Sequence, residues 1–491
     1  MKLDELIKNI KTKKIINNEK LSETEITGIS YNSKTIKKGE IFVCLVGEHT
    51  DGHEYAKMAC ENGASALFSE RELEGISVPQ IIVESTRHQI ADLAANFYDF
   101  PSKKLNLIGV TGTNGKTTVT HLIQKIVEDA ASGKECALIG TLGYKLSAAD
   151  SYHDAKHTTP QAPELQKTLE MICERKIDYV AMEVSSHALE QNRVGGCDFD
   201  GAVFTNLTQD HLDYHITMNN YFEAKAILFR GLKPGGFAVI NNDDEYAERF
   251  KSVVAQGVKI YTYGINKEAD IAATDIDFSI HGAKFTCKIF SQEKKVNLQM
   301  NGMFSVYNAL AALTAGLAMG FDADACIKAL EETKSVDGRF EIVAKKPLVV
   351  VDYAHTPDGL ENVLKAAREL TPKTSRLICL FGCGGDRDAT KRPKMGKIAD
   401  ENADIVVVTS DNPRSEDPQL IISDILAGIK SVNTQKVYVE PDRGVAISML
   451  KNIAAEDDVV IIAGKGHEDY QILKDKTIHF DDREEARKTF C

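Results

Sequence analysis

The sequence lacks any apolar run that approaches the ~20 residues a helix needs to cross a membrane. Its first residues, Met1 to Glu5, also lack the apolar region of a secretion signal. We therefore expect neither membrane insertion nor export. None of the ten cysteines stands in a Cys-x-x-Cys spacing. In a chain of 491 residues they are typical of the reduced core of a cytoplasmic protein, and not of a disulfide or zinc framework.

Net positive charge is lacking too. The 59 lysines and arginines are outnumbered by 72 aspartates and glutamates, which gives a formal net charge of −13. This balance argues against a nucleic-acid partner, because nucleic-acid binding relies on a broad basic surface. An anionic substrate would need local cationic sites. The sequence also contains no internal repeat, coiled-coil pattern or low-complexity segment.

What the sequence does contain is one recurring pattern, in which a short apolar run ends abruptly in a polar or Gly-rich loop and a helical pattern follows. The runs are LNLIGV, YVAMEV, GAVFTN, FAVI, LVVV, LICLFG, DIVVV and DVVIIAG. Continuous apolar strands that alternate with helices indicate an α/β fold with parallel sheets covered on both faces. Ligands of such sheets bind beyond the carboxyl ends of the strands, so these loops are where chemistry is expected.

The chain is too long for one ordinary core, and we expect three domains over residues 1–102, 103–335 and 336–491. The stretch Phe100-Pro101-Ser102, followed by two lysines, is typical of a linker. Residues 251–300 alternate and are rich in Thr, Ile and Phe, which predicts a small antiparallel patch inside the second domain.

The stretch GVTGTNGKTT follows a predicted strand and opens a predicted helix, which is the context of a phosphate-binding loop. Backbone N–H groups and the helix dipole attract phosphate oxygens there. Lys116 would supply a point charge, and the Thr117 hydroxyl could ligate Mg²⁺. The strict motif has Gly where this chain has Val110, so an ordinary Gly-rich turn is the alternative.

Three further motifs allow two interpretations each. Glu183, at the end of a strand, is either a Mg²⁺ ligand or the N-cap acid of the next helix. Asp210, His211, Asp213 and His215 are either site residues or capping and surface groups. Lys225, in the predicted helix NNYFEAKAILFRGL with Asn219 or Asn220 as N-cap, either lies along apolar surface or has a lowered pKa and reacts with CO₂.

The turn Asp411-Asn412-Pro413-Arg414 after the run IVVV is composed of ordinary turn residues. It is either a surface turn or a device that aims Arg414 at an anion. A planar guanidinium binds a carboxylate through two parallel hydrogen bonds.

Together these motifs resemble the Mur ligases. The resemblance rests on GTNGKTT, MEVSSHAL, TNLTQDHLDYH, YFEAKAILF, DYAHTPDGLENVL, FGCGGDRD, DNPR and GKGHEDYQ, in this order, and covers the chain from about residue 25 to its end. It is strongest toward the branch of the family that adds 2,6-diaminopimelate. Val110 is no departure from this family, whose loop reads G-T-N-G-K-T.

The resemblance implies an N-terminal UDP-binding α/β domain, a central parallel-sheet ATPase domain with the phosphate loop, and a C-terminal Rossmann-like domain for the amino acid. It implies ATP contacts by Gly112, Thr113, Asn114, Gly115, Lys116, Thr117, Thr118, Asn308, Arg339, Asp352 and His355. It implies contacts to the UDP-linked substrate by Ser33, Thr158, Thr159, Ser185, Gln191 and Arg193. It implies amino-acid contacts by Arg387, Asp411, Asn412, Pro413, Arg414, Gly464 and Glu468.

It further implies two Mg²⁺ ions, held by Thr117, Glu183, His211 and a carbamate on Lys225 (N6-carboxylysine). Lys116, Lys225, His211 and Glu183 are the implied catalytic residues. The implied protein is a cytoplasmic, monomeric ligase of peptidoglycan synthesis, and so of cell-wall growth, cell shape and division. It joins meso-2,6-diaminopimelate to UDP-N-acetylmuramoyl-L-alanyl-D-glutamate through an acyl phosphate, with release of ADP and phosphate.

Alternatives remain at this point. The amino acid could be lanthionine, a sulfur-bridged analogue of diaminopimelate, or L-lysine. A folylpolyglutamate synthase shares the core and the chemistry, but its phosphate loop lies near the N-terminus, whereas about a hundred residues precede Gly112 here. An ATP-gated switch or scaffold without turnover is a different class. A GTPase is disfavoured, because no N-K-x-D motif follows the loop.

Overall fold

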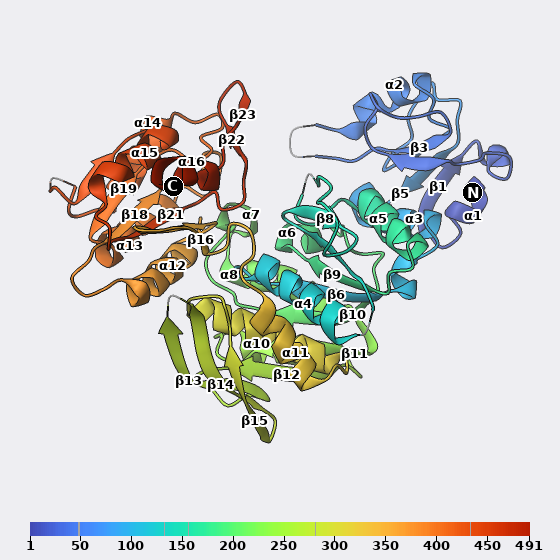
Figure 1. Cartoon of the computed structure of the whole chain (residues 1–491). Helices are drawn as coiled ribbons and strands as arrows, with labels where there is room; N and C mark the ends of the chain where they lie inside the picture. Colours follow the sequence, from blue (N-terminus) through green and yellow to red (C-terminus); the bar gives the residue numbers. More distant parts are fainter. Residues whose placement is uncertain (48–49, 132, 156, 280, 433) are drawn as a thin grey trace.

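The computed structural model describes residues 1–47, 50–131, 133–155, 157–279, 281–432 and 434–491. Three large sheets follow one another along the chain, and the N-terminal and C-terminal parts flank the central part on opposite sides (Figure 1). The first sheet has the order β1 (Thr12–Ile16), β5 (Gln80–Val83), β4 (Ala66–Ser69), β3 (Glu40–Val43) and β2 (Gly28–Ser30). It is parallel except for β1. Its helices are α1 (Leu3–Leu6), α2 (Ala56–Glu61) and α3 (Thr86–Phe97).

The central sheet carries the phosphate loop. Its order is β15 (Gln292–Asn297), β14 (Gly282–Ile289), β13 (Ile271–Ser279), β12 (Lys259–Gly264), β11 (Leu232–Asn241), β10 (Phe199–Phe204), β6 (Asn106–Thr111), β9 (Tyr179–Glu183), β7 (Cys136–Gly140) and β8 (Gly143–Lys145). The strands from β12 to β7 are parallel. The hairpins of β13, β14 and β15 confirm the predicted antiparallel patch, which extends the main sheet.

Helices cover both faces of the central sheet, as the apolar strands require. One face packs against α4 (Lys116–Ala130), α10 (Met303–Ala318) and α11 (Ala323–Glu332). The other packs against α5 (Ala162–Glu174), α6 (Ser186–Glu190), α8 (Met218–Arg230) and α9 (Ala247–Val253). The short α7 (Leu212–His215) precedes α8. The N-cap of α8 is Thr217, whose hydroxyl accepts the N–H of Asn220, so the prediction of an asparagine cap was wrong.

The third sheet has the order β16 (Glu341–Lys345), β17 (Leu348–Asp352), β21 (Val459–Ala463), β18 (Leu377–Phe381), β19 (Ile405–Val408) and β20 (Val437–Val439). Only β16 among its described strands runs antiparallel to its neighbour. One face packs against α12 (Pro357–Leu370), α13 (Lys391–Asn402) and α14 (Pro418–Leu426), the other against α15 (Arg443–Ile453) and α16 (Asp482–Phe490).

All eight predicted apolar runs form strands, and their parallel pairing confirms the predicted α/β class. After β21 the chain forms a hairpin of β22 (Tyr470–Ile472) and β23 (Thr477–His479) before α16, where a helix was expected to follow directly. The predicted linker is a 3₁₀ turn, Pro101–Lys104, with Pro101 and Ser102 buried. The three domain limits stay a prediction. In the part of the chain that the structure describes, no helix has the length and apolarity needed to cross a bilayer.

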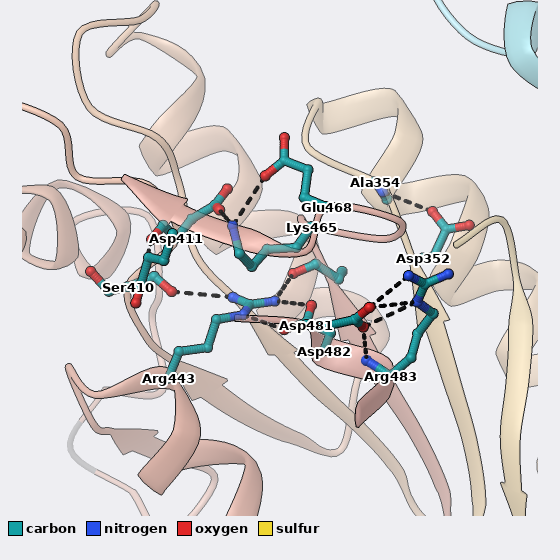
Figure 2. Close-up of polar contacts among 12 residues, drawn as sticks. Asp352, Ala354, Ser410, Asp411, Arg443, Lys465, Glu468, Asp481, Asp482 and Arg483 are labelled. Atoms are coloured by element: carbon teal, nitrogen blue, oxygen red, sulfur yellow. Dashed lines mark hydrogen bonds and ion pairs between the residues drawn. The ribbon is translucent and has the colours of Figure 1, made fainter. Parts of the chain in front are cut away.

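One buried ion pair ties the carboxyl ends of two strands in the third sheet together (Figure 2). The Arg443 side chain, which has no solvent exposure, donates to both carboxylate oxygens of Asp482 at 2.7 and 2.6 Å. It also donates to the backbone carbonyls of Ser410 at 3.2 Å and Ala463 at 2.9 Å. Ser410 is the second residue after β19 and Ala463 is the last residue of β21, so Arg443 fixes where both loops begin.

We expect Arg443→Met to destabilise the C-terminal domain by about 3–5 kcal/mol, because it leaves the buried carboxylate of Asp482 unpaired. Urea unfolding followed by far-UV circular dichroism measures this loss. The double variant Arg443→Met/Asp482→Asn, which also removes the stranded charge, should recover part of it. Equal stability of the single and double variants would show that the ion pair is not the cause.

Candidate active site

The loop between β6 and α4 is held in place by two glycines that allow close contacts. Gly112 has a φ of 154°, and a Cβ there would lie 1.9 Å from the hydroxyl oxygen of Thr205. Gly115, the N-cap residue of α4, has a φ of 88°, and its Cβ would lie 2.5 Å from Oδ1 of Asn308. Larger residues would push the loop away from β10 and α10. The loop N–H groups thus lie at the N-terminus of a 15-residue helix, where anions bind.

Two lysine amines meet under this loop. Lys116 Nζ donates to the carbonyls of Gly112 at 2.9 Å and Thr113 at 2.8 Å. Lys225 Nζ, from α8, donates to the same Gly112 carbonyl at 2.9 Å and lies 4.5 Å from the ring centroid of Tyr221. Burial lowers the pKa of both amines, and the charge of Lys116 lowers that of Lys225 further. No carboxylate pairs with Lys225 among the described residues.

A first cavity, cavity B, lies in front of the loop. Its lining includes Lys116, Thr117, Glu183, Asp210 and His211. Glu183 is buried at the end of β9, where its carboxylate accepts from the backbone N–H of Thr141 at 2.9 Å and from the Thr141 hydroxyl at 3.1 Å. It caps no helix, because Ser185 caps α6.

The residues of cavity B fit a Mg²⁺ ion that is shared with phosphates. Mg²⁺ is usually held by one or two carboxylates together with substrate oxygens, and Glu183 and Asp210 both face this cavity. Burial lowers the pKa of His211 to about 3, although Asp210 opposes the shift, so a nitrogen lone pair is free at neutral pH. Lys225 is not among the residues that line the cavity, and its role as a carbamate ligand stays a prediction.

A second cavity, cavity A, lies between the central and C-terminal domains. It is lined by the predicted ATP contacts Asn114, Gly115, Thr118, Asn308, Arg339, Asp352 and His355. Tyr263, Phe304 and Tyr307 add aromatic walls, which suit a purine base. The Gly112, Thr113, Lys116 and Thr117 positions lie in the loop itself, and the last three line cavity B.

Two hydrogen bonds close the domains over the loop. Arg339 Nη2 donates to the hydroxyl oxygen of Thr117 at 3.0 Å, and Asn114 Nδ2 donates to Oδ2 of Asp358 at 2.8 Å. Arg339 is the first arginine of the third domain, and its guanidinium also lies 4.5 Å from the ring centroid of Tyr353. Both bonds involve predicted ATP contacts, Arg339, Thr117 and Asn114.

The predicted contacts for the UDP-linked substrate form one cluster beside Glu183, except for Ser33. Arg193 donates to the carbonyl of Thr159 at 3.1 Å and to Oε1 of Gln191 at 2.8 Å. The Thr159 hydroxyl donates to the carbonyl of Glu183 at 2.8 Å and has no solvent exposure, so this side chain supports the cluster from behind. Thr158 and Ser185 both line cavity B.

Ser33 is buried in the N-terminal domain, where its carbonyl accepts from Asn62 Nδ2 at 2.8 Å. Within the described ranges no hydrogen bond joins it to the cluster. Two hydrogen bonds bridge the N-terminal and central domains nearby: the Tyr31 hydroxyl donates to Oε1 of Glu164 at 2.6 Å, and Asn192 Nδ2 donates to the carbonyl of His88 at 2.5 Å. Burial and the hydrogen bond to Glu164 raise the pKa of the Tyr31 phenol, and the charge of Arg193 opposes this shift. The sequence reasoning missed Tyr31.

A third cavity, cavity C, of about 400 Å³, lies under the DNPR turn. Its lining contains every predicted amino-acid contact except Pro413, namely Arg387, Asp411, Asn412, Arg414, Gly464 and Glu468. Pro413 is not among the lining residues, and its role as a contact stays a prediction. Arg414 has a φ of 53° and its N–H donates to the carbonyl of Ile472 at 3.1 Å, so the turn is fixed by the β22–β23 hairpin.

Only one nitrogen of the Arg414 guanidinium donates hydrogen bonds within the described part of the protein. Its Nη1 donates to the carbonyls of Gly385 at 2.8 Å and Asn412 at 3.4 Å. Nε and Nη2 have no acceptor in the described part of the protein. Burial lowers the pKa of Arg414, and the nearby charge of Arg387 lowers it further. Two arginines that face one cavity form a site for an anion.

Cavities B and C adjoin, because Thr141, Thr158, Asp210, His211, Tyr353 and His355 line both. A group activated at the phosphate loop would therefore face a group bound at the DNPR turn.

Residues 110–316 match the Mur ligase middle domain, residues 338–466 the Mur ligase glutamate ligase domain, and residues 25–98 the catalytic domain of the family. The chain belongs to the Mur ligase family.

Two relatives match this chain over nearly its full length. A UDP-N-acetylmuramoyl-L-alanyl-D-glutamate–2,6-diaminopimelate ligase of Syntrophomonas wolfei is 46% identical over 491 residues, which is 99% of this chain and 98% of the relative. A solved structure with the same enzyme name is 35% identical, with a TM-score of 0.70 and coverage of 100% and 98% of the two chains. A Mycobacterium tuberculosis folylpolyglutamate synthase shares the fold at 18% identity and a TM-score of 0.63, over 77% of this chain and 92% of its own.

Several residues of this Mur ligase site were missed. Lys391, Lys465 and Tyr470 line or support cavity C, and Thr205 and Tyr353 contact the loop and Arg339. Lys391 opens α13 after a predicted strand, so the strand-end rule could have found it. The side chain of Lys465 could not be assigned, because only its packing shows that it points inward.

We expect Lys116→Ala to raise the dissociation constant for MgATP by at least about tenfold, because a buried charge-assisted contact to phosphate is lost. Titration with a fluorescent ATP analogue measures this change. Lys125→Ala, on the same helix but paired with Asp129 away from the loop, is the matched control and should bind ATP as the parent does. Unchanged affinity in Lys116→Ala would contradict the phosphate-loop assignment.

Proposed function

We propose that this chain is the ATP-dependent ligase that joins meso-2,6-diaminopimelate to UDP-N-acetylmuramoyl-L-alanyl-D-glutamate. The observation that carries the proposal is the junction of cavities B and C at Asp210 and His211. Cavity B contains the phosphate loop and carboxylates, and cavity C contains both arginines and carboxylates. The names of the full-length relatives fit the same reaction.

In the first step, the D-glutamyl γ-carboxylate attacks the γ-phosphorus of ATP, an O–P bond forms, and ADP leaves. Both reactants are anions, so the site must offset their repulsion. Lys116 and the N-terminus of α4 contribute positive charge at the loop. Thr117, Glu183 and His211 would hold Mg²⁺, which neutralises phosphate charge when it is bound. Asn308 and the aromatic walls of cavity A would bind the adenine, and Arg339 and His355 would close over the nucleotide.

In the second step, the free amine of the amino acid attacks the acyl-phosphate carbonyl. The C–N bond forms, the amine loses a proton, and inorganic phosphate leaves. The chain's contribution is placement: Arg414 and Arg387 hold the distal carboxylate, and Asp411 and Glu468 face the distal ammonium. The reacting amine then points toward the shared wall of cavities B and C. A positioned pair of reactants gains rate because the step becomes effectively unimolecular.

Lys225 is proposed to carry CO₂ as a carbamate. Its amine is 1% exposed, has a lowered pKa and lies beside the charge of Lys116, so the neutral form is favoured. A neutral amine can attack CO₂ to form an N–C bond, and loss of one amine proton to solvent gives the carbamate anion. The anion would relieve the repulsion with Lys116 and supply an oxygen ligand toward cavity B.

We expect Lys225→Ala to lose most ligase activity, and added formate or acetate to restore part of it by supplying the missing anion. The measurement is phosphate release that depends on all three substrates. Lys233→Ala, just beyond the same helix and paired with Asp200 at the surface, serves as the control and should stay active. A crystal structure with nucleotide and Mg²⁺ that shows a plain Lys225 amine would contradict the carbamate.

Three alternatives are separated by simple assays. Amide formation is compared for meso-diaminopimelate, lanthionine, lysine and ornithine. A folylpolyglutamate synthase would use a folate in place of the UDP-linked substrate, whereas here an additional N-terminal domain is tied to the substrate cluster through Tyr31 and Glu164. An ATP-gated switch would show no steady phosphate release in the presence of all substrates.

We expect Arg414→Ala to raise the KM for diaminopimelate by at least about 100-fold, with little change in the KM for ATP. Two charge-assisted bonds to the distal carboxylate contribute roughly 3–6 kcal/mol. Lysine, which lacks this carboxylate, should remain a poor substrate, because the change removes a contact and creates none.

The control for this variant is Arg368→Ala, which removes an exposed arginine of the same domain that pairs with Asp404. Its KM values should match those of the parent. If Arg414→Ala used diaminopimelate as well as the parent does, the DNPR turn would be a surface turn only.

A further inference from the structure

A buried cation contacts two carboxylates that line cavity C, and the reaction as described does not use it. Lys465 follows Gly464 at the end of β21 and has no solvent exposure. Its turn has φ values of 122° at Gly464 and 55° at Gly466, which place the lysine side chain inside the loop. Figure 2 shows its amine between the carboxylates of Asp411 and Glu468.

The amine has three acceptors for its three protons. Lys465 Nζ lies 3.0 Å from Oε2 of Glu468, 3.1 Å from Oδ1 of Asn412 and 3.4 Å from Oδ1 of Asp411. Asn412 strengthens this arrangement, because its Nδ2 donates to the same Glu468 Oε2 at 2.9 Å. Its Oδ1 also accepts the N–H of Ile472 at 2.9 Å.

One oxygen of each carboxylate therefore remains without a hydrogen-bond donor in the described part of the protein. Among the described residues, no hydrogen bond reaches Oδ2 of Asp411 or Oε1 of Glu468. Gly464 leaves room beside Asp411 Oδ2, which would lie 3.5 Å from a Cβ at that position. Both residues line cavity C. Two free anionic oxygens that face one cavity suit an ammonium group.

The charges also balance. Asp411 and Glu468 together with Lys465 carry a net charge of −1, which matches one ammonium. Without Lys465 the two carboxylates would repel each other. Burial and the charge of Asp411 already raise the pKa of Glu468, and Lys465 opposes that shift.

We propose that Lys465 is a positioning residue for the amino-acid substrate, which holds one oxygen of Asp411 and of Glu468 so that the other oxygen of each faces the distal ammonium. This inference rests on the proposed ligase function. Lys465 itself is not among the residues that line cavity C, so it would act on the substrate through Asp411 and Glu468.

The backbone of the pocket does not depend on Lys465. Arg443 holds the carbonyls of Ser410 and Ala463, where the two loops begin, through the buried pair with Asp482 (Figure 2). The side chain of Gln471 donates to the carbonyl of Asp411 at 2.7 Å. Removal of the Lys465 amine should therefore release side chains and leave the turns in place.

The test is Lys465→Met, which keeps the length of the stem and removes the charge. We expect its KM for meso-diaminopimelate to rise at least about tenfold, with the KM for ATP within about twofold of the parent. The discriminating probe is 2-aminopimelate, which keeps the distal carboxylate and lacks the distal ammonium. The parent should prefer diaminopimelate over this probe, and the variant should lose most of that preference.

Lys474→Met, at the exposed tip of the β22–β23 hairpin, is the matched control and should keep the parent's preference. Lys465→Gln, which retains N–H donors without charge, is a second variant with the same expected loss. An unchanged preference in a folded Lys465 variant overturns the proposal alone. A parent that forms no amide with diaminopimelate overturns the proposed function with it. If neither Lys465 variant gives a cooperative thermal transition, Lys465 is a folding residue and the proposal is wrong.

Discussion

The carbonyl of Gly112 accepts hydrogen bonds from the amines of buried Lys225 and half-buried Lys116, and the rest of the site depends on this arrangement. Two ammonium groups that share one carbonyl repel each other, and desolvation penalises the charged form of each. Burial and the charge of Lys116 favour the neutral form of Lys225, whereas the carboxylates of Glu183 and Asp210 favour the charged form of Lys116. Phosphates at the loop would supply further anions for Lys116, and a modification would supply one for Lys225. Because α8 passes close beneath the loop, the two lysine amines lie together, and this concentration of basic groups suits the binding of anions.

The parallel sheet brings the residues of this site together, and the third domain covers them. The loops after β6, β9 and β10 leave the same edge of the central sheet, so Lys116, Glu183 and His211 reach one cavity without any long excursion of the chain. The opposite wall comes from the third domain, through the bonds of Arg339 and Asp358 to the loop. Residues of both domains complete cavities A, B and C. A change in the angle between the domains would open all three together.

The sequence was sufficient for the strands and the loops that carry chemistry, because continuous β-branched runs followed by Gly-rich or charged turns depend on local composition. The phosphate loop, Glu183 and the DNPR turn lie where the strand-end rule places them. The hairpin after β21 and the cap of α8 were wrong because both depend on tertiary contacts: Ile472 pairs with Arg414, and Thr217 competes with two nearby asparagines. Lys465 was invisible for the same reason, since a lysine between two glycines is ordinarily a surface residue.

The charged residues of cavity C also determine which amino-acid substrates the cavity can distinguish. Arginines at one side and carboxylates at the other recognise a centre that bears both an ammonium and a carboxylate, and a site built to pair a polar group rejects an analogue that lacks it by about 10⁴-fold. Lysine differs from diaminopimelate at this centre, so the charged ends can exclude it. Lanthionine carries the same centre and differs only in the sulfur at mid-chain. Discrimination against lanthionine must therefore come from the walls that contact the middle of the substrate chain, because a substrate with identical termini satisfies every charge in the pocket.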